Sequence, residues 1–249
     1  MSIMSRMHVE LVDLVPVPTP SERAEAMGHR QQRQQRQQTL VDARRALVLD
    51  AARAVFAEQG LEGASVRVIA KRAGYTAGAI YSYFASKEAI YTELLRESLA
   101  RLQAAVDGAR GQRSRPQRAL TEAANAWFHF YARNPRDLDL GLYLVQGLAP
   151  RGLSNELDPQ LNELLLAALK PCEDALRAFG LDDASAELEN TALFAHGMGL
   201  LFLQHTGRIR LFRQEAEPLF QRYLDQLMRR LDPEGLLLTP DGQPDLFGP

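Results

Sequence analysis

This chain of 249 residues has one cysteine, no long apolar run and almost no excess of one charge over the other. Cys172 is the only cysteine, which excludes an intramolecular disulfide and a cysteine-based zinc site. No stretch approaches the roughly 18 consecutive apolar residues of a membrane helix, and charges interrupt the N-terminal residues where a signal peptide would need an apolar block. The net charge of −2 argues against nonspecific coating of nucleic acid. We therefore expect a cytoplasmic protein with no membrane partner.

The motifs of common enzymes and metal sites are also missing. There is no HExxH zinc motif, no GxSxG nucleophile elbow and no phosphate-binding loop. The histidines are scattered along the chain, at His8, His29, His129, His196 and His205. Only the last two lie near each other in sequence, and nothing close by supplies a third ligand. We expect no enzyme, no catalytic residue, no metal and no cofactor.

What the sequence does contain is helical periodicity. Val48, Ala51, Ala52, Val55 and Phe56 recur at the spacing of one helix face. With capping residues and helix breakers taken as boundaries, we expect helices over residues 39–60, 66–73, 77–84, 86 to at least 102, 116–133, 137–147, 159–179 with a break or kink at Pro171, 183–204 and 216–231. We find no convincing alternation typical of strands. The sequence predicts an all-α fold.

The first 38 residues differ from the rest. They combine clustered prolines with the basic repeat HRQQRQQRQQ. Such a composition buries too little surface to offset the entropy of ordering the chain, so we expect a disordered arm. Its arginines, Arg30, Arg33 and Arg36, could contact DNA phosphates, or the arm could be a solvated tail.

Residues 73–90, AGYTAGAIYSYFASKEAI, have the plan of a helix-turn-helix. In this plan the second helix enters the major groove of DNA. On a helical wheel of about 100° per residue, Ile80 and Phe84 face the core, whereas Gly78 and Ser82 face outward. A small outward face lets the backbone approach base edges, and tyrosines at its borders can reach phosphates.

Residues 44–90 also resemble the DNA-binding domain of the tetracycline-repressor (TetR) family of bacterial regulators, through AARAVFAEQG, IAKRAG, AIYSYF and SKEAI. The resemblance implies three N-terminal helices that bind DNA and a C-terminal helical domain that dimerises and binds a small ligand. The positions that contact DNA in the family correspond here to Arg67, Thr76, Ala77, Gly78, Tyr81, Ser82, Tyr83 and Lys87. The resemblance also implies that ligand binding moves the fourth helix and thereby changes the spacing of the two recognition helices of a dimer.

Three positions depart from the family pattern. Tyr75 stands where a smaller apolar residue is usual, so the turn can pack differently. Ala77 and Ala79 stand where longer or polar residues are common. We therefore expect few direct hydrogen bonds to bases and a larger part for thymine methyl contacts and DNA shape.

The last two predicted helices carry apolar stripes suited to a dimer. Gly197 and Gly199 each disfavour a free helix by about 1 kcal/mol relative to Ala, which a close helix–helix contact would justify. We expect a four-helix bundle across a two-fold axis, with intramolecular core as the alternative. The expected interface residues are Leu188, Ala195, Gly199, Phe202, Phe220, Leu224, Leu227 and Leu231.

The middle of the chain is dense in aromatic residues that could line an apolar ligand pocket. The candidate pocket residues are Trp127, His129, Tyr143 and His196. For each of them, an ordinary place in the core is the alternative.

Together these features predict a sequence-specific, DNA-binding transcription regulator. We expect a homodimer on a palindromic operator, a repressor released by a small apolar effector. The alternative is an architectural or cell-division DNA-binding protein on the same fold, without an inducer. The expected regions are a disordered basic arm, a helix-turn-helix domain, a ligand-binding and dimerisation domain and a flexible tail: residues 1–38, 39–86, 87–231 and 232–249.

Overall fold

The structure is a computed structural model that describes residues 20–109, 115–142 and 157–232, with side chains from residue 27 onward. Every regular element in these residues is a helix, which confirms the predicted all-α fold. The helices are α1 (Pro20–Gly63), α2 (Val66–Ala73), α3 (Ala77–Tyr81), α4 (Lys87–Ala109), α5 (Pro116–Arg133), α6 (Pro135–Leu142), α7 (Leu157–Ala178), α8 (Asp183–His205), the 3-10 helix η2 (Arg208–Phe212) and α9 (Ala216–Leu231).

Helix boundaries agree best with the sequence where a local signal marks them. Helices α2, α5 and α9 begin and end at the predicted residues. The Ser65 hydroxyl accepts a hydrogen bond from the Val68 N–H at 3.3 Å and caps α2. Pro116 occupies the first position of α5, where the missing N–H of proline has no intrahelical partner to lose. The predicted helix over 137–147 is described as far as Leu142, and its remainder lies outside the described residues.

Helix α1 begins well before the predicted start at residue 39. Its first residue is Pro20, so residues 20–38, expected to be disordered, are helical. The segment after Pro20 is rich in Ala, Glu, Arg, Met and Gln, which are good helix formers whether or not they bury anything. The chain divides into two compact units, Met1–Val48 and Leu49–Pro249, and the boundary falls within α1.

Helix α7 contains Pro171, where the sequence predicts a break or a kink, and the proline does not end the helix. The helix continues to Ala178 with Pro171 inside it. Proline in a helix interior removes one backbone hydrogen bond and disfavours the helix by about 3 kcal/mol. Pro171 is buried, and the flanking turns of α7 bury Leu169 and Cys172 as well, so packing on both sides holds this helix together.

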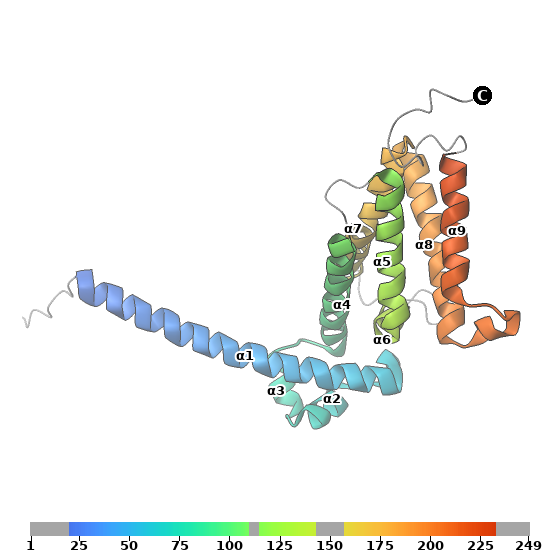
Figure 1. The fold of residues 1–249 in the computed structure, drawn as a ribbon. Coiled ribbons are helices and arrows are strands. Elements are labelled where there is room, and N and C mark those ends of the chain that lie inside the picture. Colours follow the sequence, from blue (N-terminus) through green and yellow to red (C-terminus); the bar gives the residue numbers. More distant parts are fainter. Residues whose placement is uncertain (1–19, 110–114, 143–156, 233–249) are drawn as a thin grey trace, which may run out of the picture. The chain divides into compact units, whose positions relative to one another are not determined.

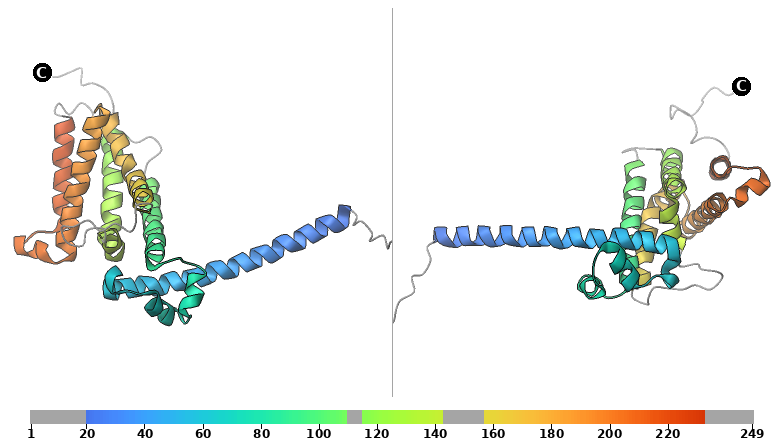
Figure 2. Two further views of the ribbon diagram at one scale, coloured as in Figure 1. Left: turned by 180° about the vertical axis from the view of Figure 1, so that it is seen from behind. Right: turned by 90° about the horizontal axis from the view of Figure 1, so that it is seen from below.

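The C-terminal helices form a bundle (Figure 1). Helices α4, α5 and α7 contact one another, α8 packs on α5 and α7, and α9 packs on α8. In the core, the Phe220 ring stacks on Phe128 with centroids 4.0 Å apart and meets Trp127 edge-on at 5.4 Å. All three side chains are almost completely buried. Figure 2 shows from two further sides that η2 projects beyond the α8–α9 pair.

Candidate functional site

The two short helices α2 and α3 form the surface that the sequence assigns to DNA. Gly74 ends α2 in the left-handed conformation (φ 74°), which favours glycine. The Thr76 hydroxyl accepts a hydrogen bond from the Ala79 N–H at 3.2 Å and caps α3. Ile80 and Phe84 are buried, so the predicted inward face of α3 is confirmed.

The outward face of α3 is small and open. A Cβ built on Gly78 would have no neighbouring atom within 4 Å. Ser82 is exposed and Tyr81 is 57% exposed, so both are accessible to a partner. Helix α3 ends at Tyr81 rather than at the predicted Phe84, because the Ser82 hydroxyl donates to the Ala79 carbonyl at 2.7 Å and the chain turns there.

The remaining predicted DNA contacts fall into two groups. Arg67 and Thr76 are exposed, whereas Ala77 and Tyr83 are half-buried at the edges of the same surface. Lys87 differs from both groups. Its ammonium donates to the backbone carbonyls of Leu61 at 2.9 Å and Ala64 at 3.4 Å.

Lys87 thus contacts its own chain here, and its phosphate contact stays a prediction. Carbonyls at a helix end lack intrahelical partners and attract cations. The sequence signal for this was Gly60, which leaves helical geometry (φ 66°) near the end of α1 and presents the following carbonyls.

A bidentate ion pair holds α2 on the end of α1. The Arg72 guanidinium donates to both carboxylate oxygens of Glu58, at 2.6 and 2.8 Å. The hydrogen bond with Arg72 lowers the pKa of Glu58 below its ordinary value. Because both side chains are largely exposed, the pair orients α2 more than it stabilises the fold.

The C-terminal bundle contains an apolar cavity of about 350 Å3. Five helices line it, α4 to α8, and its walls are Leu95, Leu99, Tyr131, Leu138, Gly141, Leu142, Leu161, Asn162, Leu165, Phe194 and Met198. Burial, and the nearby Asp137 carboxylate, raise the pKa of the Tyr131 phenol far above its ordinary value, so this hydroxyl stays protonated at neutral pH. Tyr131 and Asn162 are the only polar side chains among these wall residues.

Of the residues predicted to line a pocket, the three that the structure describes, Trp127, His129 and His196, do not line this cavity. Trp127 is in the aromatic core. His129 pairs with Glu217 at 2.9 Å, and the His196 ring stacks on Tyr223 with centroids 4.2 Å apart. Tyr143 lies outside the described residues.

The alternative reading, an ordinary place in the fold, therefore holds for Trp127, His129 and His196. The cavity walls are mostly leucines, and the prediction missed them because it followed aromatic density. The available signal was the i, i+4 spacing of Leu95 and Leu99 on α4.

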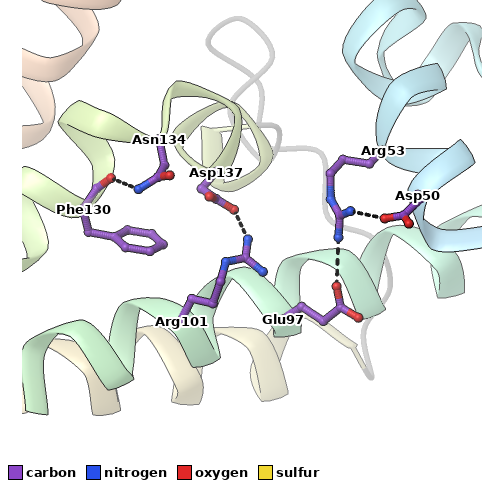
Figure 3. A network of polar contacts seen from close by, with 7 residues as sticks. All are labelled: Asp50, Arg53, Glu97, Arg101, Phe130, Asn134 and Asp137. Atoms are coloured by element: carbon purple, nitrogen blue, oxygen red, sulfur yellow. Dashed lines mark hydrogen bonds and ion pairs between the residues drawn. The ribbon is translucent and has the colours of Figure 1, made fainter. Parts of the chain in front are cut away.

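Helix α4 has polar contacts with both α1 and α6 (Figure 3). It begins three residues after Phe84 and presents Leu95 and Leu99 to the cavity. Arg53 on α1 donates to Glu97 on α4 at 3.0 Å. One turn further on, Arg101 donates to Asp137 on the cavity-lining helix α6.

A second contact joins α4 to α6. The Tyr91 hydroxyl donates to the Leu140 carbonyl at 2.6 Å, and the same tyrosine meets Phe56 of α1 edge-on at 5.2 Å. Helix α4 therefore contacts α1 on one side and the cavity-lining helix α6 on the other.

The predicted dimer residues separate into exposed and buried sets. Leu188, Ala195, Gly199 and Phe202 are exposed on α8. Phe220, Leu224 and Leu227 are buried within the chain, because the apolar side of α9 faces its own bundle. These three are corrected to intramolecular core, and Leu231 is half-buried.

The glycines on α8 follow the same division. A Cβ on Gly197 would come within 2.2 Å of Trp127 Cη2, so the close approach predicted there is to α5 of the same chain. A Cβ on Gly199 would meet nothing within 4 Å, so this position stays open to a second molecule.

The described residues contain no group of three His, Cys, Asp or Glu side chains placed to hold a metal ion. Within the same residues, no helix has the length and apolar character required to cross a membrane. Cys172 is buried, and its burial raises the pKa of the thiol to about 12, so the thiolate that reacts with electrophiles is scarce at neutral pH.

Residues 48–94 match the sequence model of the bacterial regulatory proteins of the tetR family. The repressor KstR2 of Mycobacterium tuberculosis is 39% identical over 97 residues, which cover 37% of this chain and 48% of that protein. The fatty acid metabolism regulator of Bacillus subtilis is 30% identical over 118 residues, covering 47% and 58%. The chain thus spans about half the length of these curated relatives.

Solved structures of regulators share the fold over most of their length. FadR of Bacillus subtilis in complex with stearoyl-CoA aligns with a TM-score of 0.58 at 24% identity, covering 73% of this chain and 96% of that one. A TetR-like regulator from Rhodococcus sp. RHA1 aligns with a TM-score of 0.59 at 18% identity, covering 76% and 95%. With its capped helix-turn-helix and its match to the family model, the segment 48–94 is a DNA-binding domain of the tetR family of bacterial regulatory proteins, and the chain as a whole shares the helical fold of the solved regulators.

Proposed function

We propose that this protein is a homodimeric transcription repressor that binds a palindromic operator and releases it when a small apolar molecule enters the bundle cavity. One observation carries the proposal: α4 follows the DNA-reading helices directly and also forms part of the cavity wall. A ligand that displaces Leu95 or Leu99 therefore acts on the element that positions α3.

DNA reading rests on the exposed face of α3. Gly78 and Ser82 make room for the edges of base pairs, and Tyr81 and Arg67 reach the phosphates on either side. Buried Ile80 and Phe84 hold the short helix in place, so the face is presented by a rigid frame rather than by a mobile loop.

The chemistry of the cavity defines the effector. A volume of about 350 Å3 is at the small end of ligand pockets, and walls that are almost entirely leucine, phenylalanine and methionine favour an apolar molecule. Tyr131 and Asn162 can each hydrogen-bond one polar group of it. The FadR structure similar in fold holds stearoyl-CoA, so acyl-CoA thioesters are the first class to test.

Dimerisation is assigned to the exposed side of α8. Leu188, Ala195, Gly199 and Phe202 follow one another at intervals of seven, four and three residues, which places them in one stripe along the helix. The small residues in the middle of the stripe allow a second α8 to approach closely. Light scattering should show a dimer that Ala195→Glu converts to a folded monomer with weak operator binding.

An architectural or cell-division role on the same fold is the second candidate. It requires no inducer and predicts a filled bundle. The apolar pocket lined by α4 to α8 favours the regulator, because it offers a place where an effector can bind.

The decisive experiment combines operator selection with a matched pair of cavity variants. Random duplexes are enriched on the purified protein, and the recovered operator is followed by fluorescence anisotropy during titration with acyl-CoA thioesters of increasing chain length. Leu165→Trp fills the cavity, whereas Leu166→Trp adds the same side chain at a position on α7 that is 65% exposed.

We expect both variants to bind the operator and only Leu166→Trp to release it with effector, as the wild type does. Linkage requires that operator weaken effector binding by the same factor as effector weakens operator binding. An effector that releases Leu165→Trp as readily as the wild type would place the effector site elsewhere. Operator binding that no thioester changes would exclude acyl-CoA thioesters as the effector class.

A further inference from the structure

The N-terminal part of α1 carries an unbroken block of positive charge. Between Glu25 and Asp42 the sequence holds Arg30, Arg33, Arg36 and no acidic residue. The three arginines are the first members of three consecutive Arg-Gln-Gln triplets, residues 30–38. Basic blocks at an N-terminus are typical of arms that bind nucleic acid.

This segment has no apolar face. Every residue from Met27 to Leu40 is exposed, and residues 28–39 contain no large apolar side chain. A coiled coil needs apolar residues at every third or fourth position, and a helix that lies in a membrane surface needs an apolar side. The composition therefore excludes both kinds of partner and leaves a polar, charged one.

The arginines share one side of the helix and are free to bind. At about 100° per residue, a spacing of three places them within an arc of about 120°, and each step advances about 4.5 Å along the axis. Most of the glutamines occupy the opposite side. Among the described residues, none of these three guanidinium groups has an ion-pair or hydrogen-bond partner.

We propose that this basic arm, Arg30, Arg33 and Arg36, binds the phosphate backbone of duplex DNA outside the base pairs that α3 reads. Duplex DNA carries about one negative charge per 1.7 Å of its axis, so a row of exposed arginines always finds phosphates within reach. The arm is joined by about a dozen residues to the domain that reads DNA, which gives it a high effective concentration near the flanking duplex. This inference rests on the proposed function, because it takes duplex DNA as the partner.

The repeat itself supplies a variant that removes the charge and keeps the helix. Arg and Gln have nearly equal helix propensities, so the triple variant R30Q/R33Q/R36Q extends the glutamine pattern without disturbing α1. The variant R30K/R33K/R36K keeps the charge. As a control for net charge, R208Q/R210Q/R213Q removes three exposed arginines in and beside η2.

The experiment measures operator affinity across a salt series on two duplexes. One duplex ends at the operator, and the other extends by about one helical turn on each side. Each phosphate contact contributes about 0.9 to the slope of log affinity against log salt concentration. On the extended duplex we expect R30Q/R33Q/R36Q to lower the slope by about 2 to 3 per chain, while the lysine variant and R208Q/R210Q/R213Q keep it.

On the duplex that ends at the operator, the wild type and the glutamine variant should have the same slope. Equal slopes on the extended duplex would overturn the proposal. Thermal melting followed by circular dichroism checks that the variant folds.

A failure of the proposed function looks different. In that case the wild type selects no operator, and the arm is tested alone by comparing the wild type and the glutamine variant on a random long duplex. Equal slopes there would also overturn the proposal.

Discussion

Two helical glycines show how differently two regions of this protein use the same residue. On α8, Gly197 lies against Trp127, and a Cβ there would come within 2.2 Å of the indole ring. On α3, Gly78 faces open space. Gly197 permits a close contact inside the chain, whereas Gly78 leaves space at the surface where another molecule can approach the backbone.

The comparison separates two uses of glycine. Gly197 lies in the interior of α8, where glycine disfavours the helix by about 1 kcal/mol relative to Ala, whereas Gly78 is the second residue of the five-residue α3. At Gly197 the gain is the packing of Trp127 and Phe220 in the folded monomer. At Gly78 the folded monomer gains nothing, so the benefit has to come from binding.

The largest effect on stability should come from Gly197→Ala. The new methyl group overlaps Trp127 in a core that cannot yield easily, and overpacking of this kind destabilises by about 1–3 kcal/mol. Gly199→Ala, two residues along the same helix, meets no atom and should leave the folded chain as stable or up to about 1 kcal/mol more stable. Urea denaturation of both variants tests the contrast, which equal stabilities would refute.

Lys87→Gln should destabilise the DNA-binding part by about 1 kcal/mol. The ammonium holds two carbonyls at the end of α1, and hydrogen bonds to charged groups contribute about 1.5–3 kcal/mol, reduced here because the side chain is half exposed. Thermal melting measures the loss. If the variant melts like the wild type but its DNA affinity depends less steeply on salt concentration, Lys87 contacts a phosphate.

Arg67→Gln should weaken DNA binding and leave the stability of the fold nearly unchanged, the reverse of Lys87→Gln. Arg67 is exposed and has no ion-pair partner among the described residues, so the folded state should lose little stability. Binding to all duplexes should weaken alike, with a salt slope lower by about 0.9 per chain. A variant that changes base preference while keeping its slope would mean that Arg67 reads bases.

The smallest effect should be a pH dependence that arises at His196. Burial lowers the pKa of this imidazole below its ordinary value of 6.5, so the unfolded chain binds the proton more readily than the folded one. The folded state should therefore lose stability as the pH falls below about 6.5. Thermal melts at pH 5 and pH 8 should show a smaller difference for His196→Gln than for the wild type, and an unchanged difference would assign the effect to other groups.

The sequence predicted those parts of the fold that depend on contacts between residues close together in the chain. The ends of α2 and α5 depend on Ser65 and Pro116, which act on their own turns, and the sequence predicted both. The inward side of α3 followed from the spacing of Ile80 and Phe84 for the same reason. These are local properties.

The cavity and the core of α9 could not be predicted in the same way. Whether Phe220 meets a partner or its own chain depends on which side of α9 packs on the bundle, and an apolar stripe is the same in both cases. The cavity is the space that five helices leave unfilled, so no single segment encodes it. The position of Lys87 likewise depends on a helix end more than twenty residues earlier in the chain.

The central claim is that the open face of α3 enters the DNA groove, and Gly78→Leu tests it most directly. Affinity for the selected operator and for a scrambled duplex is measured at several salt concentrations, with Gly108→Leu as the matched change at another open helical glycine. We predict that Gly78→Leu loses the preference for operator while its melting temperature stays close to that of the wild type. Operator binding by Gly78→Leu that equals that of the wild type would contradict the account.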